Sequence, residues 1–266
     1  MDLATIVGIV VGLIAMYVGI VGSNGTILPF FNIPSVFVVF VGSLASMTIG
    51  NTFADMIAGL KSFKLVLKIP VHDIKSIITK IIELSNVARK EGLLSLEEAA
   101  SDLDDPFLKK GILLIVDGTD PDLVRGIMET ELVSIESRHK KKIGFWETFG
   151  AYGPSWGMIG TLLGLIIALG NLSDVASLGP TMAMTFITTL YGSMLANLLC
   201  IPVVGKLKIQ NDNEMMIKEI MIEGLLSIQA GENPRVIEEK LKSFLSPADR
   251  AAPSEEDALE GGAQDG

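Results

Sequence analysis

Two apolar stretches in the second half of the chain are rich in glycine and threonine. In the first, glycines recur on one smooth helical face, at Gly153, Gly157, Gly160 and Gly164. In the second, one helical face carries Thr181, Thr185, Thr188 and Gly192, with Thr189 beside it. A smooth face lets another helix approach closely, and hydroxyl oxygens can replace part of an ion's hydration shell. The pattern favours either a hydroxyl-lined ion path or plain packing, with each hydroxyl bonded to a carbonyl four residues earlier.

Three threonines and two prolines are the candidate functional residues of these stretches. Thr161 lies at the edge of the glycine face, and we predict that it lines an ion pathway together with Thr188 and Thr189. Pro154 lies near the start of the first stretch and Pro202 near the end of the second. A proline inside a helix removes a backbone hydrogen bond and can act as a hinge, although punctuation of a helix end explains Pro154 equally well.

Groups that perform catalysis or bind metals are sparse. Both histidines, His72 and His139, fall in polar segments, and the single cysteine, Cys200, lies in an apolar run. The sequence has no HExxH motif, no glycine-rich phosphate loop and no recognisable Ser/His/Asp set. We therefore predict that the protein is not an enzyme and uses no cofactor. Since no charged residue falls in mid-membrane, ion transport would need hydroxyls and carbonyls, or a carboxylate from a second protein.

The distribution of charge along the 266 residues indicates membrane-spanning helices. Uncharged gaps separate Asp2 from Asp55, Glu147 from Asp174, and Asp174 from Lys206. Each gap exceeds the roughly 20 apolar residues that cross a bilayer, and the first is long enough for two crossings. These gaps predict four spans, at about 4–22, 33–54, 148–170 and 178–205.

Basic residues predict the orientation of the spans. They follow the second span, precede the third and follow the fourth, whereas the loops 23–32 and 171–179 contain no lysine or arginine. Because basic loops stay in the cytoplasm, both termini and the insert between the second and third spans are predicted to be cytoplasmic. The net charge of −10 argues against nucleic acid as a partner.

The sequence thus predicts an all-α membrane protein with four transmembrane helices and a helical cytoplasmic domain between spans two and three. Glycine at 92 is expected to end a helix over 73–90, and Ser95 with Glu98 matches a capping box. Asp120-Pro121 and Asn233-Pro234 are expected to start helices, and the fourth span to continue to about Ala230. The predicted segments are transmembrane helices 1–54, a cytoplasmic domain 55–147, transmembrane helices 148–205, cytoplasmic helices 206–246 and an acidic disordered tail 247–266.

With these motifs the chain resembles the A subunit of the bacterial flagellar motor stator, the MotA/PomA family, from its first residues to about Arg250. The matching segments are ARKEGLLSLE over 88–97, VDG over 116–118, GPSWGMIGTLLG over 153–164, TTLYG over 188–192 and NPRVIE over 233–238. Together with the four-span order, these segments are highly specific.

The resemblance implies a homopentamer in the bacterial cytoplasmic (inner) membrane, with five copies surrounding two copies of a MotB/PomB-like B subunit. Each B subunit has a single span with an ion-binding aspartate and a domain that grips peptidoglycan. Ion flow turns the A ring and drives a FliG-like rotor protein, which would give the chain a role in motility and chemotaxis.

The resemblance also implies roles for individual residues. Arg89 and Glu97 match charged residues that face the rotor, and Pro154 and Pro202 match prolines linked to torque and conformational change. Thr161 and Thr189 match hydroxyls of sodium-driven members, so the expected coupling ion is sodium, bound transiently by these threonines, with the proton as the alternative.

Two other functions fit parts of the pattern. Energisers of outer-membrane transport of the ExbB/TolQ type share the two glycine- and threonine-rich spans, but they usually have three spans. An autonomous ion channel or transporter would work without a partner, and the lack of mid-membrane charge argues against it.

Overall fold

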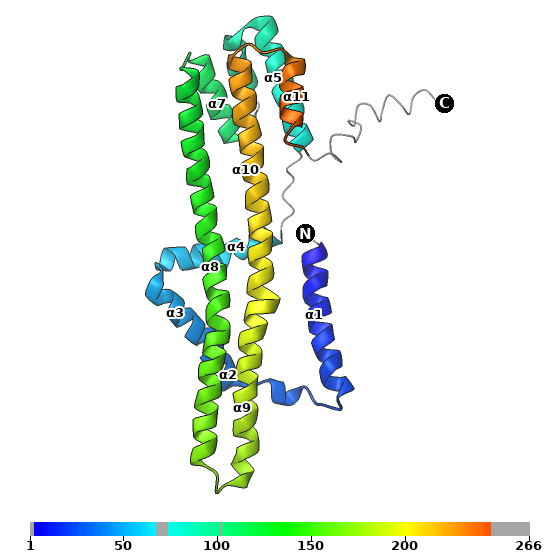
Figure 1. Cartoon of the computed structure of the whole chain (residues 1–266), viewed down its shortest axis with the longest axis vertical. Helices are drawn as coiled ribbons and strands as arrows, with labels where there is room; N and C mark the ends of the chain where they lie inside the picture. The colour runs from blue at the N-terminus through cyan, green and yellow to red at the C-terminus, as the bar shows by residue number, and fades with distance from the viewer. Residues whose placement is uncertain (1–2, 68–73, 102, 246–266) are drawn as a thin grey trace, which may run out of the picture. The chain divides into compact units, whose positions relative to one another are not determined.

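The computed structural model describes residues 3–67, 74–101 and 103–245, and every regular element within these ranges is helical (Figure 1). The chain divides into two compact units, residues 1–70 with 137–210 and residues 71–136 with 211–266. Two long helices, α8 (Pro121–Gly170) and α10 (Ile201–Gln229), contribute a segment to each unit. The predicted tail, 247–266, lies outside the described residues.

The first unit contains the apolar helices. Candidate membrane spans cover Leu3–Gly22, Leu28–Gly50 and the apolar parts of Pro121–Gly170 and Leu178–Gln229, so the all-α fold with four spans is confirmed. Besides its segments of α8 and α10, this unit contains α1 (Leu3–Gly22), α2 (Ile33–Val36), α3 (Gly42–Gly50), α4 (Phe53–Val66) and α9 (Val175–Met194). A 3-10 turn lies at Leu28–Phe30, and π-helical segments join α2 to α3 (Phe37–Val41) and α9 to α10 (Leu195–Cys200).

The second span ends at Gly50, four residues before the predicted end at Ala54. Asn51 is extended, with φ of −135°, and the Thr52 hydroxyl accepts a hydrogen bond from the Asp55 backbone N–H (3.2 Å). A threonine N-cap satisfies a backbone N–H that has no partner inside the helix, and it therefore begins a new helix, α4, at this point. The lack of charge up to Asp55 could not show this break.

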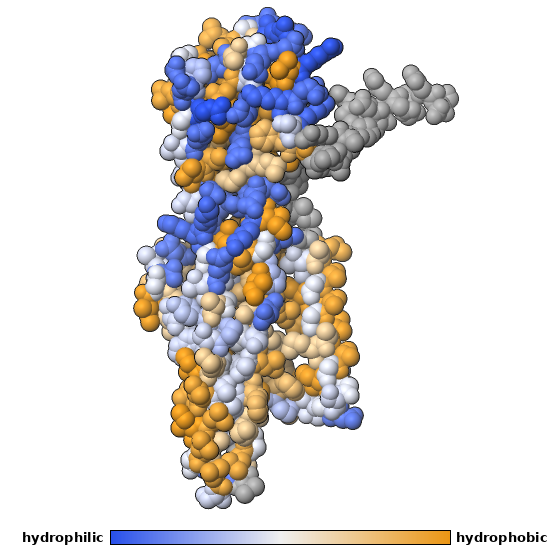
Figure 2. Space-filling view, viewed as in Figure 1, coloured by the Kyte–Doolittle hydropathy of each residue, from blue (hydrophilic) through white to orange (hydrophobic). Residues whose placement is uncertain are grey.

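Helix α1 has no buried residue within the described chain. Its visible surface in Figure 2 is predominantly apolar, as is the end of the hairpin formed by α8 and α9. A helix that is apolar on all sides suits lipid, because its backbone groups are satisfied internally.

Aromatic side chains of α8 hold α3 and α4 in place. The indole N–H of Trp146 donates to the Ser62 hydroxyl on α4 (3.0 Å), and that of Trp156 donates to the Ser46 hydroxyl on α3 (2.9 Å). Both bonds satisfy a polar group in apolar surroundings, where an unpaired donor is costly. Gly59 of α4 lies directly against the Phe145 ring of α8, because the missing side chain at Gly59 leaves room for this ring.

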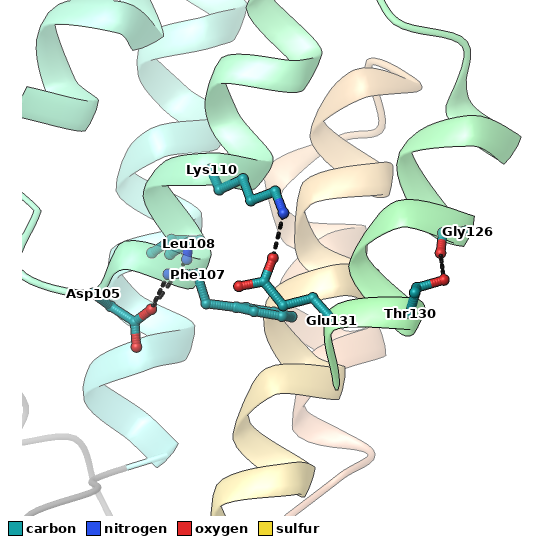
Figure 3. Close-up of polar contacts among 7 residues, drawn as sticks. All are labelled: Asp105, Phe107, Leu108, Lys110, Gly126, Thr130 and Glu131. Carbon is teal, nitrogen blue, oxygen red and sulfur yellow. Dashed lines mark hydrogen bonds and ion pairs between the residues drawn. The ribbon is translucent and has the colours of Figure 1, made fainter. Parts of the chain in front are cut away.

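The second unit packs the remaining helices around a core of large apolar side chains. These helices are α5 (Ile74–Glu91), α6 (Leu96–Ser101), α7 (Pro106–Val116) and α11 (Pro234–Lys242), with a 3-10 turn at Leu93–Ser95 and segments of α8 and α10. The fully buried residues include Ile81, Leu96, Phe107, Ile112 and Leu225. Figure 3 shows how α7 is anchored: Asp105 accepts from the backbone N–H groups of Phe107 (2.8 Å) and Leu108 (3.1 Å), and Lys110 pairs with Glu131 of α8 (2.5 Å).

Most of the predicted helix ends are confirmed. Gly92 follows α5 with a φ of 91°, and Gly231 follows α10 with a φ of 69°, a left-handed conformation that glycine adopts without strain. Asp120 caps α8, which begins at Pro121 and continues through the third span, and Asn233 caps α11.

The predicted capping box is wrong. The Ser95 hydroxyl donates to the Gly92 carbonyl (2.7 Å), and the Ser95 N–H also points to Gly92 O (3.3 Å), closing the 3-10 turn. Helix α6 begins at Leu96, so the predicted start of a helix directly after Ser95 is confirmed, although the capping bonds are not formed. The glycine turn immediately upstream offers Ser95 a nearer acceptor than Glu98 does.

The Glu223 carboxylate on α10 joins two other helices and gives a stability prediction. It pairs with Arg125 of α8 (2.8 Å) and Lys240 of α11 (3.2 Å). Burial by itself would raise the pKa of Glu223, but hydrogen bonds from Arg125 and Lys240 outweigh burial and leave the pKa lowered. A lowered folded pKa adds stability above the unfolded pKa of about 4.3, and this stability is lost as pH falls through the folded value.

We therefore expect Glu223→Gln to destabilise the full chain at neutral pH by about 1 kcal/mol, because both cations are partly exposed to solvent and screened. The difference from the parent should shrink as pH falls below the unfolded pKa of about 4.3, and it should vanish once the carboxylate of the folded parent is protonated. Thermal unfolding in detergent across pH measures this, with Glu219→Gln on the same helix as the control. A constant difference at all pH values would show that shape and not charge matters at Glu223.

Candidate functional site

The glycine face of α8 lies directly against α9, as the sequence pattern predicts. A β-carbon added to Gly157 would lie 2.9 Å from the Thr188 carbonyl oxygen, and one on Gly160 would lie 2.6 Å from Thr188 Cγ2. Gly153 faces Gly192 in the same way, with 3.0 Å from such a carbon to the Gly192 carbonyl oxygen. Backbone therefore meets backbone at Gly153 and Gly157, and a threonine side chain of α9 fills the space left by Gly160, a close approach that small residues permit.

Two predicted threonines meet across this contact. The hydroxyl oxygens of Thr161 on α8 and Thr189 on α9 lie 2.5 Å apart. Thr161 Oγ1 also lies 3.0 Å from the Gly157 carbonyl and 3.1 Å from the Thr185 carbonyl. One hydroxyl hydrogen cannot serve all three neighbours at once, so the group forms a cluster of four neutral oxygens with lone pairs to spare. Thr189 is exposed within the isolated chain, so this cluster is open to another helix.

Thr188, the third predicted pathway residue, lies elsewhere. It is fully buried against Gly160, and its hydroxyl donates to the Thr185 carbonyl (2.9 Å). Thr185 is buried as well, and its own hydroxyl donates to the Thr181 carbonyl (3.0 Å). These are the local helix bonds expected of packed threonines. The structure thus brings Thr161 and Thr189 together. The Thr188 hydroxyl instead points into the contact between α8 and α9.

The two prolines lie at special points of the same helices. Pro154 is inside α8, next to the place where Gly153 meets Gly192. Pro202 follows the π-helical segment Leu195–Cys200 by two residues, at the start of α10. Proline donates no backbone hydrogen bond, and a π-bulge adds a second local irregularity, so α10 is weakened at its start. Both sites suit a bend in an otherwise continuous helix.

Residues without a predicted role also shape this site. The Tyr191 hydroxyl donates to the Phe30 carbonyl and lies 3.3 Å from the Asn32 backbone N–H, so it can accept from that group. This ties α9 to the segment that leads into the second span. The aromatic residue stands out within the sequence TTLYG, but its partner, far away in the chain, could not be predicted.

The two predicted rotor-facing charges lie in the second unit, separately from the threonine cluster. Arg89 is exposed in the last turn of α5, and Glu97 is exposed in the first turn of α6. Gly92 and the 3-10 turn at Leu93–Ser95 lie between the two helices. Within the described residues neither side chain takes part in an ion pair or side-chain hydrogen bond, so both charges are available to a partner.

Comparisons with known proteins define the family. Residues 99–220 match the model of the MotA/TolQ/ExbB proton channel family. The chain is 40% identical to Motility protein A of Borreliella burgdorferi over 94% of this chain and 96% of that protein. It is also 38% identical to the chemotaxis protein PomA of Vibrio alginolyticus over 94% of this chain. This chain belongs to the MotA/PomA family.

Structural similarity supports the same family. The flagellar MotAB stator complex from Bacillus subtilis contains a chain that aligns with a TM-score of 0.86 at 31% identity, covering 93% of this chain and 98% of that one. The similarity to MotA and PomA proteins includes the first two spans, which lie outside the region matched by the broader channel family. The MotA/PomA family is a family of motor and channel proteins and not of enzymes.

Proposed function

We propose that this chain is the ion-conducting, torque-generating A subunit of a flagellar stator. It works with a single-span B subunit that supplies the ion-binding aspartate and anchors the complex to peptidoglycan. The observation that carries this proposal is the oxygen cluster at Thr161 and Thr189, which is open to another helix and has no charged side chain of its own. A partner's carboxylate would complete it as a cation site.

Sodium is the proposed coupling ion. The cluster offers two hydroxyl and two carbonyl oxygens, and neutral oxygens can stand in for part of the hydration shell of a metal cation. A proton needs only the carboxylate and makes no use of this set. Thr188 is left out of the proposed path, because its hydroxyl lies inside the contact between α8 and α9.

The proposed assembly is a ring of five A subunits around two B subunits in the inner membrane. The exposed apolar surface of α1 agrees with a position against lipid. Segments 55–147 and 206–246 are proposed to form the cytoplasmic part that meets a FliG-like rotor protein. Pro154 and Pro202 are proposed to bend α8 and the start of α10 as the ion passes.

Co-expression with the B subunit tests this function. In a strain without its own stator, the two chains together should restore swimming, and the purified complex should have the mass of five A and two B subunits. The A chain alone should restore nothing. Swimming or ion flux from the A chain alone would favour an autonomous channel, and a complex that energises outer-membrane uptake without restoring swimming would favour an ExbB/TolQ-type role.

The proposed orientation can be tested by thiol labelling. In a Cys200→Ser background, an impermeant reagent should label Ser23→Cys from outside intact cells, because Ser23 is exposed just after α1. It should not label Ser101→Cys, which is equally exposed but lies at the end of α6. Labelling of Ser101→Cys in intact cells would reverse the orientation and remove the proposed rotor contact.

Arg89→Glu should strongly reduce swimming while membrane insertion and binding of the B subunit remain normal. Arg89 is exposed and makes no ion pair with the described residues, and such a charge contributes little to folding but can determine how a partner docks. Swimming speed and the amount of co-purified B subunit measure the two effects separately. Lys90→Glu, on the neighbouring exposed position, is the control for a general change of charge. Loss of the B subunit from Arg89→Glu would show that Arg89 is structural.

A further inference from the structure

The first unit contains a cavity of about 260 Å³ between the amino-terminal half of α1 and the start of α10. Its walls come from α1, with Gly8 and Ile9, from α4, with Phe63, and from the helix around the π-helical segment, with Leu199 and Val203. Most of the lining residues are apolar. Such a cavity suits a hydrocarbon group, because it offers water few hydrogen-bond partners.

Two glycines of α1 show how the cavity arises. Gly8 and Gly12 lie one turn apart on the same side of the helix. A β-carbon on Gly12 would lie 2.7 Å from Leu198 Cδ1, whereas one on Gly8 would meet no atom within 4 Å. Helix α1 therefore touches the π-helical segment at Gly12 and leaves open space one turn closer to its amino end.

The depth of the cavity matches one leaflet of a bilayer. Its lining extends along the chain from Leu198 to Lys206, which is about 12 Å of helix. The hydrocarbon part of one leaflet is roughly 15 Å deep. On the proposed orientation, Lys206 lies at the cytoplasmic end and Leu198 lies deeper. Since α1 has no buried residue within the described chain, lipid can reach the helix that forms this wall.

The cytoplasmic end of the cavity carries positive charge. Lys206 is the charged residue among the described residues of the lining. Lys64 is exposed in the last turn of α4, next to the lining residue Phe63. Anionic lipids are concentrated in the cytoplasmic leaflet, and basic pockets between spans on that side bind their head groups. An apolar cavity with a cation at its surface end is complementary to an acyl chain joined to a phosphate.

We propose that this cavity holds an acyl chain of an anionic phospholipid from the cytoplasmic leaflet, with Lys206 beside the lipid phosphate. The proposal rests on the proposed orientation, which places Lys206 at the cytoplasmic surface. Pro202 lines the same cavity. The lipid therefore contacts α10 at the point where the bend is proposed, and it separates α1 from this part of α10.

Photolabelling tests the occupant. The probe is phosphatidylglycerol with a diazirine on its acyl chain, diluted into phosphatidylcholine nanodiscs that hold the full chain assembled with its B subunit. Illumination should label the lining at Ile9 or Leu199, mapped by mass spectrometry. The same diazirine on phosphatidylcholine should label these residues roughly fivefold less, which is the contribution expected of one lysine near an anionic head group.

Gly8→Leu should remove most of the labelling at Leu199, because the new side chain occupies the open space beside α10. Gly19→Leu is the matched control, since a β-carbon at Gly19 also meets no atom within 4 Å and Gly19 lies on α1 outside the described lining. Unchanged labelling at Leu199 in Gly8→Leu would overturn the proposal, because the lipid would then reach Leu199 from outside the cavity.

Lys206→Gln should abolish the preference for phosphatidylglycerol, whereas Lys206→Arg should keep it. Lys208→Gln is the control for the loss of one charge, because Lys208 pairs with Glu147 (2.6 Å) and lies outside the described lining. A preference that persists in Lys206→Gln would contradict the proposed contact with the phosphate.

A second copy of the chain or the B subunit is the alternative occupant. In that case the lipid-facing side of α1 would be labelled while Leu199 stayed unlabelled, and the proposal would be wrong. Photolabelling does not depend on rotation, so it remains interpretable if the proposed motor function fails. Thiol labelling at Ser23→Cys and Ser101→Cys tests the orientation separately.

Discussion

Gly192→Ala is expected to abolish swimming and to reduce the amount of assembled stator. An added β-carbon would lie 2.5 Å from the Gly153 carbonyl oxygen and 3.1 Å from Pro154 Cα. Both neighbours are backbone atoms, so no side chain can rotate away, and α8 and α9 must separate. Overpacking of this kind costs about 1–3 kcal/mol even where side chains can adjust. Separation of the helices would also move Thr161 away from Thr189, because their contact lies within about two helical turns of Gly192 and Gly153.

Gly170→Ala is the matched control, because a β-carbon at that position of α8 meets no atom within 4 Å. It should leave swimming unchanged. Membrane levels of both variants, measured by immunoblot, separate a folding defect from a functional one. Normal swimming with Gly192→Ala would show that the two helices are not held in close contact in the working protein.

Thr161→Ala should remove sodium-driven rotation or raise the sodium concentration for half-maximal speed about tenfold, which corresponds to about 1.4 kcal/mol of binding free energy. The change deletes one oxygen of the cluster and keeps the residue small, so the close contact of α8 with α9 should survive. Speed of single motors against sodium concentration at constant pH measures the effect, together with the amount of assembled stator.

Thr188→Ala is the informative control for Thr161→Ala, because its hydroxyl is bonded inside α9 and lies away from the proposed path. It should leave the sodium dependence almost unchanged. An equal shift in both variants would mean that the threonines act through packing alone. An unchanged sodium dependence in Thr161→Ala would remove Thr161 from the ion site.

The sequence predicted the parts of the fold that depend on local signals. Charge gaps located four apolar helices, and Asp120, Asn233 and the two glycines at 92 and 231 marked helix ends that the structure confirms. Each signal acts within a few residues, through a cap or a left-handed turn. The capping box at Ser95 failed for a related reason, since the turn at Gly92 offered a competing acceptor within three residues.

Features that depend on distant partners were beyond the sequence. The bond from Tyr191 to Phe30 joins residues 161 positions apart, and the Trp146–Ser62 bond joins residues 84 apart. The pattern of glycines and threonines indicated two smooth faces but could not tell which hydroxyl would meet which. The register between α8 and α9 decides this. In the structure, Thr161 contacts Thr189 and Thr188 packs against Gly160. The π-helical segments Phe37–Val41 and Leu195–Cys200 have no clear local signal in the sequence.

The most direct test is the rotation of single motors in a strain where this chain and its B subunit form the only stator. Rotation speed is measured as sodium is varied at constant pH and constant ionic strength. We expect no rotation without sodium and a saturable rise as sodium is added. Rotation at full speed without sodium would contradict sodium as the coupling ion, and no rotation under any ion gradient, with the complex present in the membrane, would contradict the stator function itself.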